Sequence, residues 1–140
     1  MDKLLLLPTS SFMALQEYQQ DQVLEAMTQL FNCKDITSLI DATAHVGCDA
    51  INFSKIFPNA KIICIDCDKR AIDVLQQNIE TVDSSRFTVV HSSCVDYIHE
   101  NMPHADIFYF DPPWGGYGYI KQPLFNLQLD DQDISVLIKF

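Results

Sequence analysis

The stretch FDPPWGGY, residues 110–117, concentrates residue types that can hold a flat, polar ligand. It contains the only tryptophan of the chain and two of its four glycines. Pro112 and Pro113 fix two φ angles and remove two backbone donors, so the carbonyls of Asp111 and Pro112 are left to accept from an exocyclic amine. Trp114 offers a face on which a base can stack, a contact worth roughly 1–3 kcal/mol. The alternative is a proline-rich turn beside a core tryptophan.

Two more aspartates stand at the ends of apolar runs. Asp41 lies at the end of TSLIDAT (37–43), and Asp66 lies near the end of AKIICIDCD (60–68). Ligands of parallel sheets bind outside the carboxyl ends of the strands, where an acidic residue on the second strand can accept from two ribose hydroxyls. Asp68 is better placed than Asp66 to cap the next helix. Asp41, Asp66 and Asp111 at one sheet edge therefore favour a ligand site over three helix caps.

The other two strand ends are less specific. DATAHVGCDA, residues 41–50, surrounds Gly47 and fits a tight loop that holds a nucleotide-like ligand against backbone amides. It has neither a GxGxxG pattern nor the Lys and Ser/Thr of a phosphate-binding loop, so a plain turn fits equally well. After the third apolar run, Ser92 and Ser93 could either hydrogen-bond an adenine edge or cap the following helix. The sequence leaves both readings open.

The elements that must position these residues alternate along the chain. Helices are predicted over 10–32, 49–56, 69–81 and 94–101, strands over 37–43, 60–68, 86–92 and 105–111, and a last element begins near 133. Alternating strands and helices predict βαβ units with right-handed crossovers. We therefore expect an α/β fold, a parallel sheet flanked by helices, in a single domain over 1–140 with the helical segment 1–32 packed on it.

Composition limits the function classes. The formal net charge is −10, and the nine Lys and Arg are scattered, whereas a protein that grips long nucleic acid through its phosphates needs a basic face. We expect a small or cationic substrate, or a protein partner that supplies the basic surface. The run Leu4 to Leu7 stops at Pro8 and is too short for a signal peptide or a membrane span, so no membrane contact and a cytoplasmic or nuclear location are expected.

Cysteine usage favours reduced thiols. Five cysteines without paired spacing do not form a disulfide framework. Cys64 and Cys67 make a CxxC at a predicted strand end, but no second pair or histidine stands at ligand spacing. No metal site is predicted, and buried thiols are the preferred interpretation.

These motifs resemble those of a known family. A [DNS]PP[YFW] tetrapeptide after a fourth strand is the signature of S-adenosylmethionine-dependent methyltransferases that modify exocyclic amines. PPWGG with tyrosines beyond it resembles the trimethylguanosine synthase family of RNA cap guanine-N2 methyltransferases. Residues 41–54 are similar to that family's first motif and residues 64–78 to its second, so the resemblance spans 38–120. It implies a Rossmann-like methyltransferase fold, shortened at its C-terminal end, and a compact cap methyltransferase of a large DNA virus also fits.

The resemblance implies S-adenosylmethionine as cofactor and N2 of guanine in a 7-methylguanosine RNA cap, or a small nucleotide-like substrate, as acceptor. It assigns cofactor contacts to Asp41, Thr43, Ala44, Gly47, Asp66, Cys67, Ser93, Cys94 and Asp111. It assigns catalysis to Asp111, Pro112, Pro113 and Trp114, and substrate contacts to Trp114, Gly115, Tyr117 and Lys121. The positive charge of 7-methylguanine would add a cation–π contribution of roughly 0.5–2 kcal/mol on Trp114.

Three features depart from the family pattern. His45 and Cys48 stand where the family's first loop usually has glycines, Ser92-Ser93 replaces the Gly-Asp of its third motif, and the chain is short. Two alternatives therefore stay open. One is an adenine-N6 methyltransferase acting on RNA or DNA, and the other is a catalytically silent or incomplete methyltransferase-fold subunit that binds a cap or a partner.

Overall fold

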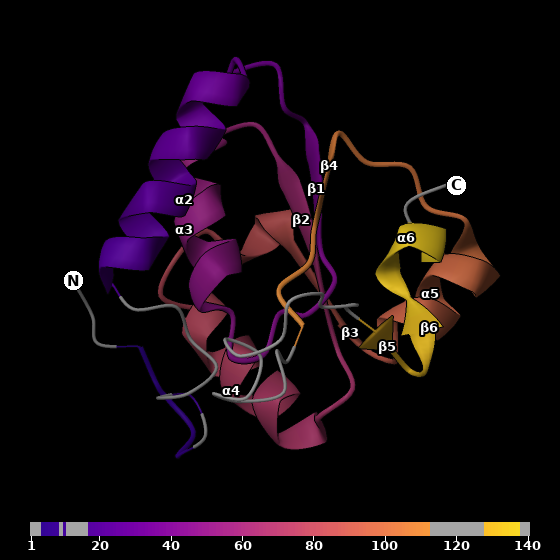
Figure 1. Cartoon of the computed structure of the whole chain (residues 1–140). Coiled ribbons are helices and arrows are strands. Elements are labelled where there is room, and N and C mark those ends of the chain that lie inside the picture. The colour runs from indigo at the N-terminus through magenta and orange to yellow at the C-terminus, as the bar shows by residue number, and fades with distance from the viewer. Residues whose placement is uncertain (1–3, 9, 11–16, 113–127, 138–140) are drawn as a thin grey trace.

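The computed structural model describes residues 4–8, 10, 17–112 and 128–137 (Figure 1). Its main sheet has four strands, β1 Ser38–Asp41, β2 Lys61–Asp66, β3 Phe87–His91 and β4 Ile107–Tyr109. Its helices are α2 Glu17–Leu30, α3 Cys48–Ile56, α4 Lys69–Ile79, α5 Cys94–Asn101 and α6 Ile134–Leu137, with a 3-10 turn at Ser84–Arg86. A small hairpin pairs β5 Gln128–Leu129 with β6 Gln132–Asp133.

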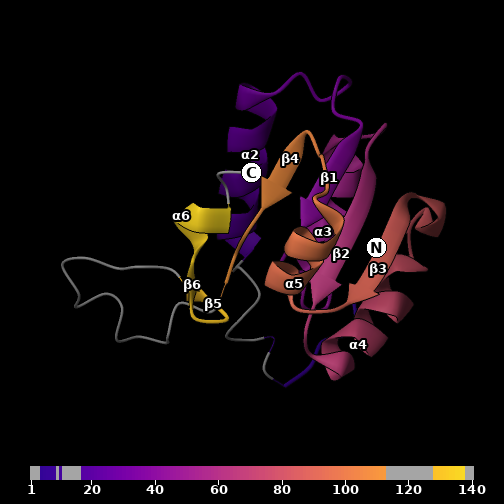
Figure 2. The ribbon, with the colours of Figure 1, turned by 90° about the vertical axis from the view of Figure 1, so that its right-hand side faces the viewer.

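The four strands are parallel and lie in the order β3-β2-β1-β4 (Figure 2). The order reverses between β1 and β4, which makes the gap above these two strands the switch point of the sheet. Register places Asp41 level with Cys64 and Tyr109, so Asp66 and Asp111 each lie two residues further along the chain from these partners, at the same edge of the sheet. The predicted parallel α/β architecture is confirmed.

Helices cover both faces of this sheet, as parallel sheets require. Figure 1 shows α2, α3 and α4 on one side and α5 and α6 on the other. The first side buries Leu39, Ile62 and Cys64 of the strands with Ala50, Phe53 and Leu75 of the helices and with Phe57, the residue that follows α3. The second buries Ile40, Ala42 and Ile65 with Cys94, Val95 and Leu137. Alternate residues of each strand thus enter opposite cores.

The C-terminal end of α3 is held by one side chain. The guanidinium of Arg86 donates from Nη2 to Ser54 O at 2.8 Å and from Nη1 to Phe57 O at 3.0 Å. Nη1 also lies within 3.3 Å of Pro58 O and Ala60 O. Arg86 therefore satisfies helix-end and loop carbonyls that have no intrahelical partner.

Element boundaries differ modestly from the predictions. Each strand is shorter than its apolar run, because the flanking residues turn into the loops at the sheet edge. The helix predicted over 10–32 is described from Glu17 to Leu30, and the hairpin at 128–133 was not predicted. Over the described residues, no helix is long and apolar enough to cross a membrane.

Candidate active site

A cavity of about 370 Å³ opens at the carboxyl ends of the parallel strands. Its wall takes residues from every strand end and from the β5–β6 hairpin. The lining residues are Ala42, Thr43, Ala44, His45, Val46, Cys48, Asp49, Asp66, Cys67, Asp68, Arg70, Ser92, Cys94, Asp111, Leu129 and Asp130. A cavity of this size, at the switch point of a parallel sheet, suits a nucleotide-sized ligand.

The loop between β1 and α3 forms one wall of the cavity, and two of its residues have a left-handed backbone conformation. His45 has φ 46° and Gly47 has φ 85°. The turn is closed by Gly47 N–H, which donates to Ala44 O at 2.8 Å, and Ala44 N–H reaches Ile65 O on β2 at 2.9 Å. A Cβ at position 47 would lie 3.1 Å from Leu75 Cγ. Glycine is therefore required here both for its φ and for the close approach of α4.

Asp66 braces the same loop from β2. Its Oδ2 accepts from His45 N–H at 2.7 Å, and its Oδ1 accepts from Asp68 N–H at 2.8 Å. Asp68 caps α4 as predicted, accepting from Arg70 N–H at 2.9 Å. Asp66 is therefore not the helix cap, and both of its oxygens already accept from backbone amides. Each oxygen keeps a second lone pair, so hydrogen bonds from ribose hydroxyls remain possible.

The fourth strand end is tied to the first loop. Ala42 N–H donates to Tyr109 O at 2.9 Å, and Asp111 N–H donates to Thr43 Oγ1 at 2.8 Å. Pro112 is buried behind Asp111. The contacts expected of Pro113, Trp114, Gly115, Tyr117 and Lys121 lie outside the described residues and stay predictions.

Carboxylates dominate the electrostatics of the cavity. Burial raises the pKa of Asp49 to about 6, and the negative charge of Asp111 adds to the effect. Burial also raises the pKa of Asp41 well above its usual range, with Asp49 as the next cause. Burial lowers the pKa of His45. Among the lining residues, Arg70 is the only Lys or Arg, and it pairs with Asp68 at 2.9 Å. A cationic ligand would therefore be favoured here.

Most of the predicted cofactor contacts reach this cavity. Thr43, Ala44, Asp66, Cys67, Cys94 and Asp111 line it, whereas Asp41, Gly47 and Ser93 are not among its lining residues. Asp41 is buried and accepts from Thr43 N–H at 3.3 Å. Ser93 caps α5, accepting from Val95 N–H at 3.1 Å and also donating to Asp130. Of the two readings left open for the serines, the structure gives Ser93 the cap and places Ser92 on the cavity wall.

Sequence reasoning missed two acidic lining residues. Asp49 sits in the first turn of α3, two residues after Gly47, and that position next to the loop was the available signal. Asp130 has φ 48° in the turn between β5 and β6. An Asp-Asp pair is a common turn signal, yet nothing in it indicates that the turn faces Ser93.

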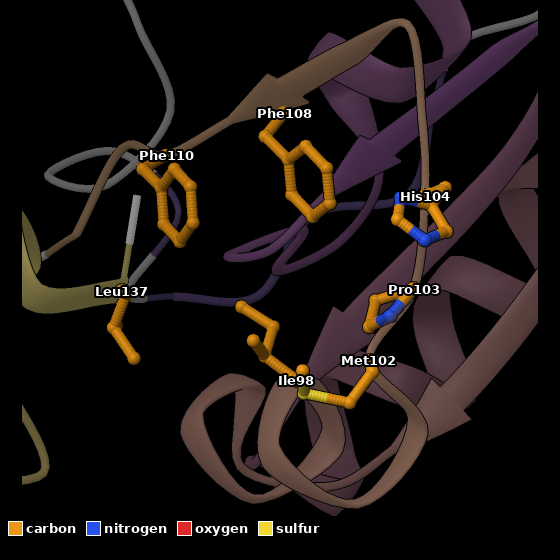
Figure 3. A pocket seen from close by; sticks show the side chains of 7 residues that line it. All are labelled: Ile98, Met102, Pro103, His104, Phe108, Phe110 and Leu137. Carbon is orange, nitrogen blue, oxygen red and sulfur yellow. The ribbon is translucent and has the colours of Figure 1, made fainter. Parts of the chain in front are cut away.

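A second hollow of about 210 Å³ lies beside β4 and has a different character (Figure 3). Its lining residues are Ile98, Met102, Pro103, His104, Phe108, Phe110 and Leu137. The rings of Phe108 and Phe110 are nearly parallel, at 12°, with centroids 6.5 Å apart. This apolar lining lacks the carboxylates and loop amides of the larger cavity, which makes the larger cavity the better cofactor candidate.

The cysteines were predicted to be buried thiols. Cys64 is buried, whereas Cys67 is exposed at the cavity. Over the described ranges, no three His, Cys, Asp or Glu side chains are grouped so as to hold a metal ion.

Comparison with known proteins shows which family the sequence of this chain matches. Residues 36–140 match the family described as RNA cap guanine-N2 methyltransferase. The chain is 36% identical over 99 residues to an uncharacterized protein of Acanthamoeba polyphaga mimivirus, a match that covers 70% of this chain and 37% of that protein.

Solved structures share the fold at low identity. Precorrin-6y C5,15-methyltransferase from Geobacter metallireducens superposes with a TM-score of 0.63 at 14% identity, over 76% of this chain and 53% of that one. TrmN from Thermus thermophilus gives a TM-score of 0.56 at 15% identity, over 66% of this chain and 28% of that one. The chain thus spans about half or less of the length of these proteins.

Proposed function

This chain belongs to the family of RNA cap guanine-N2 methyltransferases, and on that premise we propose that it methylates N2 of guanine in a 7-methylguanosine RNA cap. The methyl donor that membership implies is S-adenosylmethionine. The observation that carries the proposal is the bond from Asp111 N–H to Thr43 Oγ1, 2.8 Å long, which holds the first residue of the DPPW motif against the loop that lines the cavity.

We place the cofactor in the 370 Å³ cavity. Asp66 would accept from the ribose hydroxyls, and the loop from Thr43 to Val46 would face the methionine portion. Cys67, Ser92 and Cys94 would border the adenine. Carboxylates of Asp49 and Asp111 suit the ammonium and sulfonium charges, which is the electrostatic match expected between this cavity and a cationic ligand.

S-adenosylmethionine supplies a methyl group that its sulfonium charge already activates, so the protein contributes mainly positioning. Asp111 and the Pro112 carbonyl would orient the exocyclic amine by accepting its hydrogens. Asp111 would then take or relay the proton that leaves N2. Trp114 would stack on the 7-methylguanine ring, where the positive charge of the base strengthens the contact.

The test is methyl transfer from radiolabelled S-adenosylmethionine to short RNAs. We expect label on RNA with a 7-methylguanosine cap, and none on the same RNA with an unmethylated guanosine cap or on uncapped adenine-rich RNA. Label on the adenine-rich RNA alone would replace the proposal with adenine-N6 methylation. Absence of transfer by protein that binds S-adenosylhomocysteine would identify a silent domain.

Two substitutions locate the chemistry. Trp114→Ala should weaken cap binding while leaving the affinity for S-adenosylhomocysteine nearly unchanged, because the stacking face touches only the base. Asp111→Asn should abolish most transfer. Asp73→Asn, an exposed carboxylate on α4, is the matched control and should retain full transfer. Equal loss of cap and cofactor affinity in Trp114→Ala would show that Trp114 is structural.

A further inference from the structure

Asn78 connects two segments that are far apart in sequence. It lies on α4 and only 1% of its surface is exposed. Its Nδ2 donates to Val46 O at 2.8 Å and to Leu5 O at 2.9 Å, and its Oδ1 accepts from Leu5 N–H at 2.7 Å. Every polar group of this amide therefore meets a backbone group, 32 residues away on one side and 73 on the other.

The carbonyl that Asn78 holds belongs to the cavity wall. Val46 lies between His45 and Gly47, the two residues with positive φ, and it lines the cavity itself. Asp66 fixes the N–H of His45 from the opposite side of the turn. Asn78 thus adds a contact from α4 to a loop that β2 already holds through Asp66.

The other partner of Asn78 belongs to the segment over residues 4–7, which lies outside any helix or strand. Leu4 packs against the core formed with α3 and α4, whereas the side chains of Leu5 and Leu6 are 50% and 57% exposed. Leu5 therefore contributes to this arrangement through its backbone, whose N–H and C=O both bond to Asn78.

We propose that Asn78 is a positioning residue of the cofactor site, and that it transmits the placement of the segment Leu4–Leu7 to the loop that lines the cavity. Docking of this segment fixes the amide of Asn78, and that amide fixes the Val46 carbonyl. The inference rests on placing the cofactor in this cavity, as argued under Proposed function. It requires neither methyl transfer nor a particular acceptor base.

The test deletes a backbone donor by substituting proline, which lacks an N–H and introduces no charge. Leu5→Pro deletes the donor to Asn78 Oδ1, and Leu6→Pro is the matched control in the same exposed stretch. We expect S-adenosylhomocysteine to bind about fivefold more weakly to Leu5→Pro, which loses one hydrogen bond of this amide, and about tenfold more weakly to Asn78→Ala, which loses all three. Leu6→Pro should bind as the unaltered chain does.

Amide hydrogen exchange without ligand gives a readout independent of affinity. Exchange at Val46 and Gly47 should accelerate in Leu5→Pro and Asn78→Ala, and the double variant should bind no more weakly than Asn78→Ala alone. The inference is overturned if both single variants lose thermal stability yet keep the cofactor affinity and the loop protection of the unaltered chain. If Asn78→Ala does not fold, Leu5→Pro against Leu6→Pro decides the question. Failure of the unaltered chain to bind would instead contradict the proposed function.

Discussion

The backbone nitrogen of Asp111 lies 2.8 Å from Thr43 Oγ1, so a hydroxyl on the first loop fixes the residue at which the DPP motif begins. This bond joins two strand ends, after β1 and after β4, that are neighbours in the sheet and 68 residues apart in sequence. As a result, the first loop and Asp111 are held in a fixed position relative to each other. A change on either side should be felt at the other.

Thr43→Val tests this coupling, because valine keeps the shape of threonine and removes the acceptor. Loss of one partly buried hydrogen bond should cost about 1–2 kcal/mol. If the proposed function holds, we expect methyl transfer to fall by about tenfold at saturating cofactor, measured as kcat on capped RNA, because a small misplacement of Asp111 would displace the amine that it is proposed to orient. Thr43→Ser keeps the hydroxyl and should retain most of the activity. Equal activity of both variants would show that the bond does not position the turn.

Gly47→Ala probes the left-handed turn of the loop. The φ of 85° and the approach of Leu75 Cγ to 3.1 Å both oppose a side chain at this position. We expect the free energy of unfolding in urea to fall by about 2 kcal/mol. In a Leu75→Ala background the steric part should vanish while the φ penalty stays, so the alanine should cost less there. An unchanged cost would assign the whole effect to φ.

Asp49 should make stability depend on pH. Its pKa is raised from 3.8 to about 6 by burial first and by Asp111 second. The folded protein therefore binds this proton more tightly than the unfolded chain. Proton binding by Asp49 therefore adds to the free energy of unfolding. This stabilisation is fully present below pH ~4 and is lost as the pH rises through about 6, by an amount of order 3 kcal/mol.

Asp49→Asn removes that penalty. We expect the variant to be more stable than the unaltered chain at pH 7.5 and nearly equal to it at pH 4.5, as measured by urea unfolding. S-adenosylmethionine affinity should rise with pH through about 6 in the unaltered chain, because a cationic ligand favours the ionised carboxylate, and this rise should be absent in Asp49→Asn. Asp73→Asn is the exposed control, and a similar pH response in both variants would contradict the assignment to Asp49.

Arg86→Lys should destabilise the chain although the charge is kept. A lysine cannot reach the four carbonyls that the guanidinium contacts from Ser54 to Ala60. We expect the free energy of unfolding to fall by about 2 kcal/mol, because partly buried carbonyls, among them Ser54 O, lose the donor that Arg86 supplies. Arg70→Lys, on the exposed start of α4, should have little effect. A small effect at Arg86 would mean that water replaces the lost donors.

The sequence predicted the layers of this fold because its strands and helices alternate with clear periods. Asp66 and Asp111 were found from their places at the ends of apolar runs, where topology alone brings them to one edge. Two things escaped prediction for physical reasons. The backbone amides that engage Asp66 come from a loop whose shape depends on His45 and Gly47, and no side-chain pattern encodes those bonds. Ser92 and Ser93 have the same side chain, so the sequence does not tell which of them caps α5. Only the position at which α5 begins makes Ser93 the cap and leaves Ser92 on the cavity wall.

The small size of β4 has a consequence for folding. This strand has three residues and, among the described strands, pairs with β1 alone, whereas β2 has a neighbour on each side. Closing a loop of 68 residues costs more chain entropy than the shorter loops of the β1–β2–β3 unit, so we expect β4 to dock later and to open more readily. The cavity therefore exists only in the completely folded chain, and a local opening of β4 dismantles it while most of the sheet persists. Ligand that bridges the first loop and Asp111 would suppress this opening, so cofactor binding should protect β4 against local unfolding.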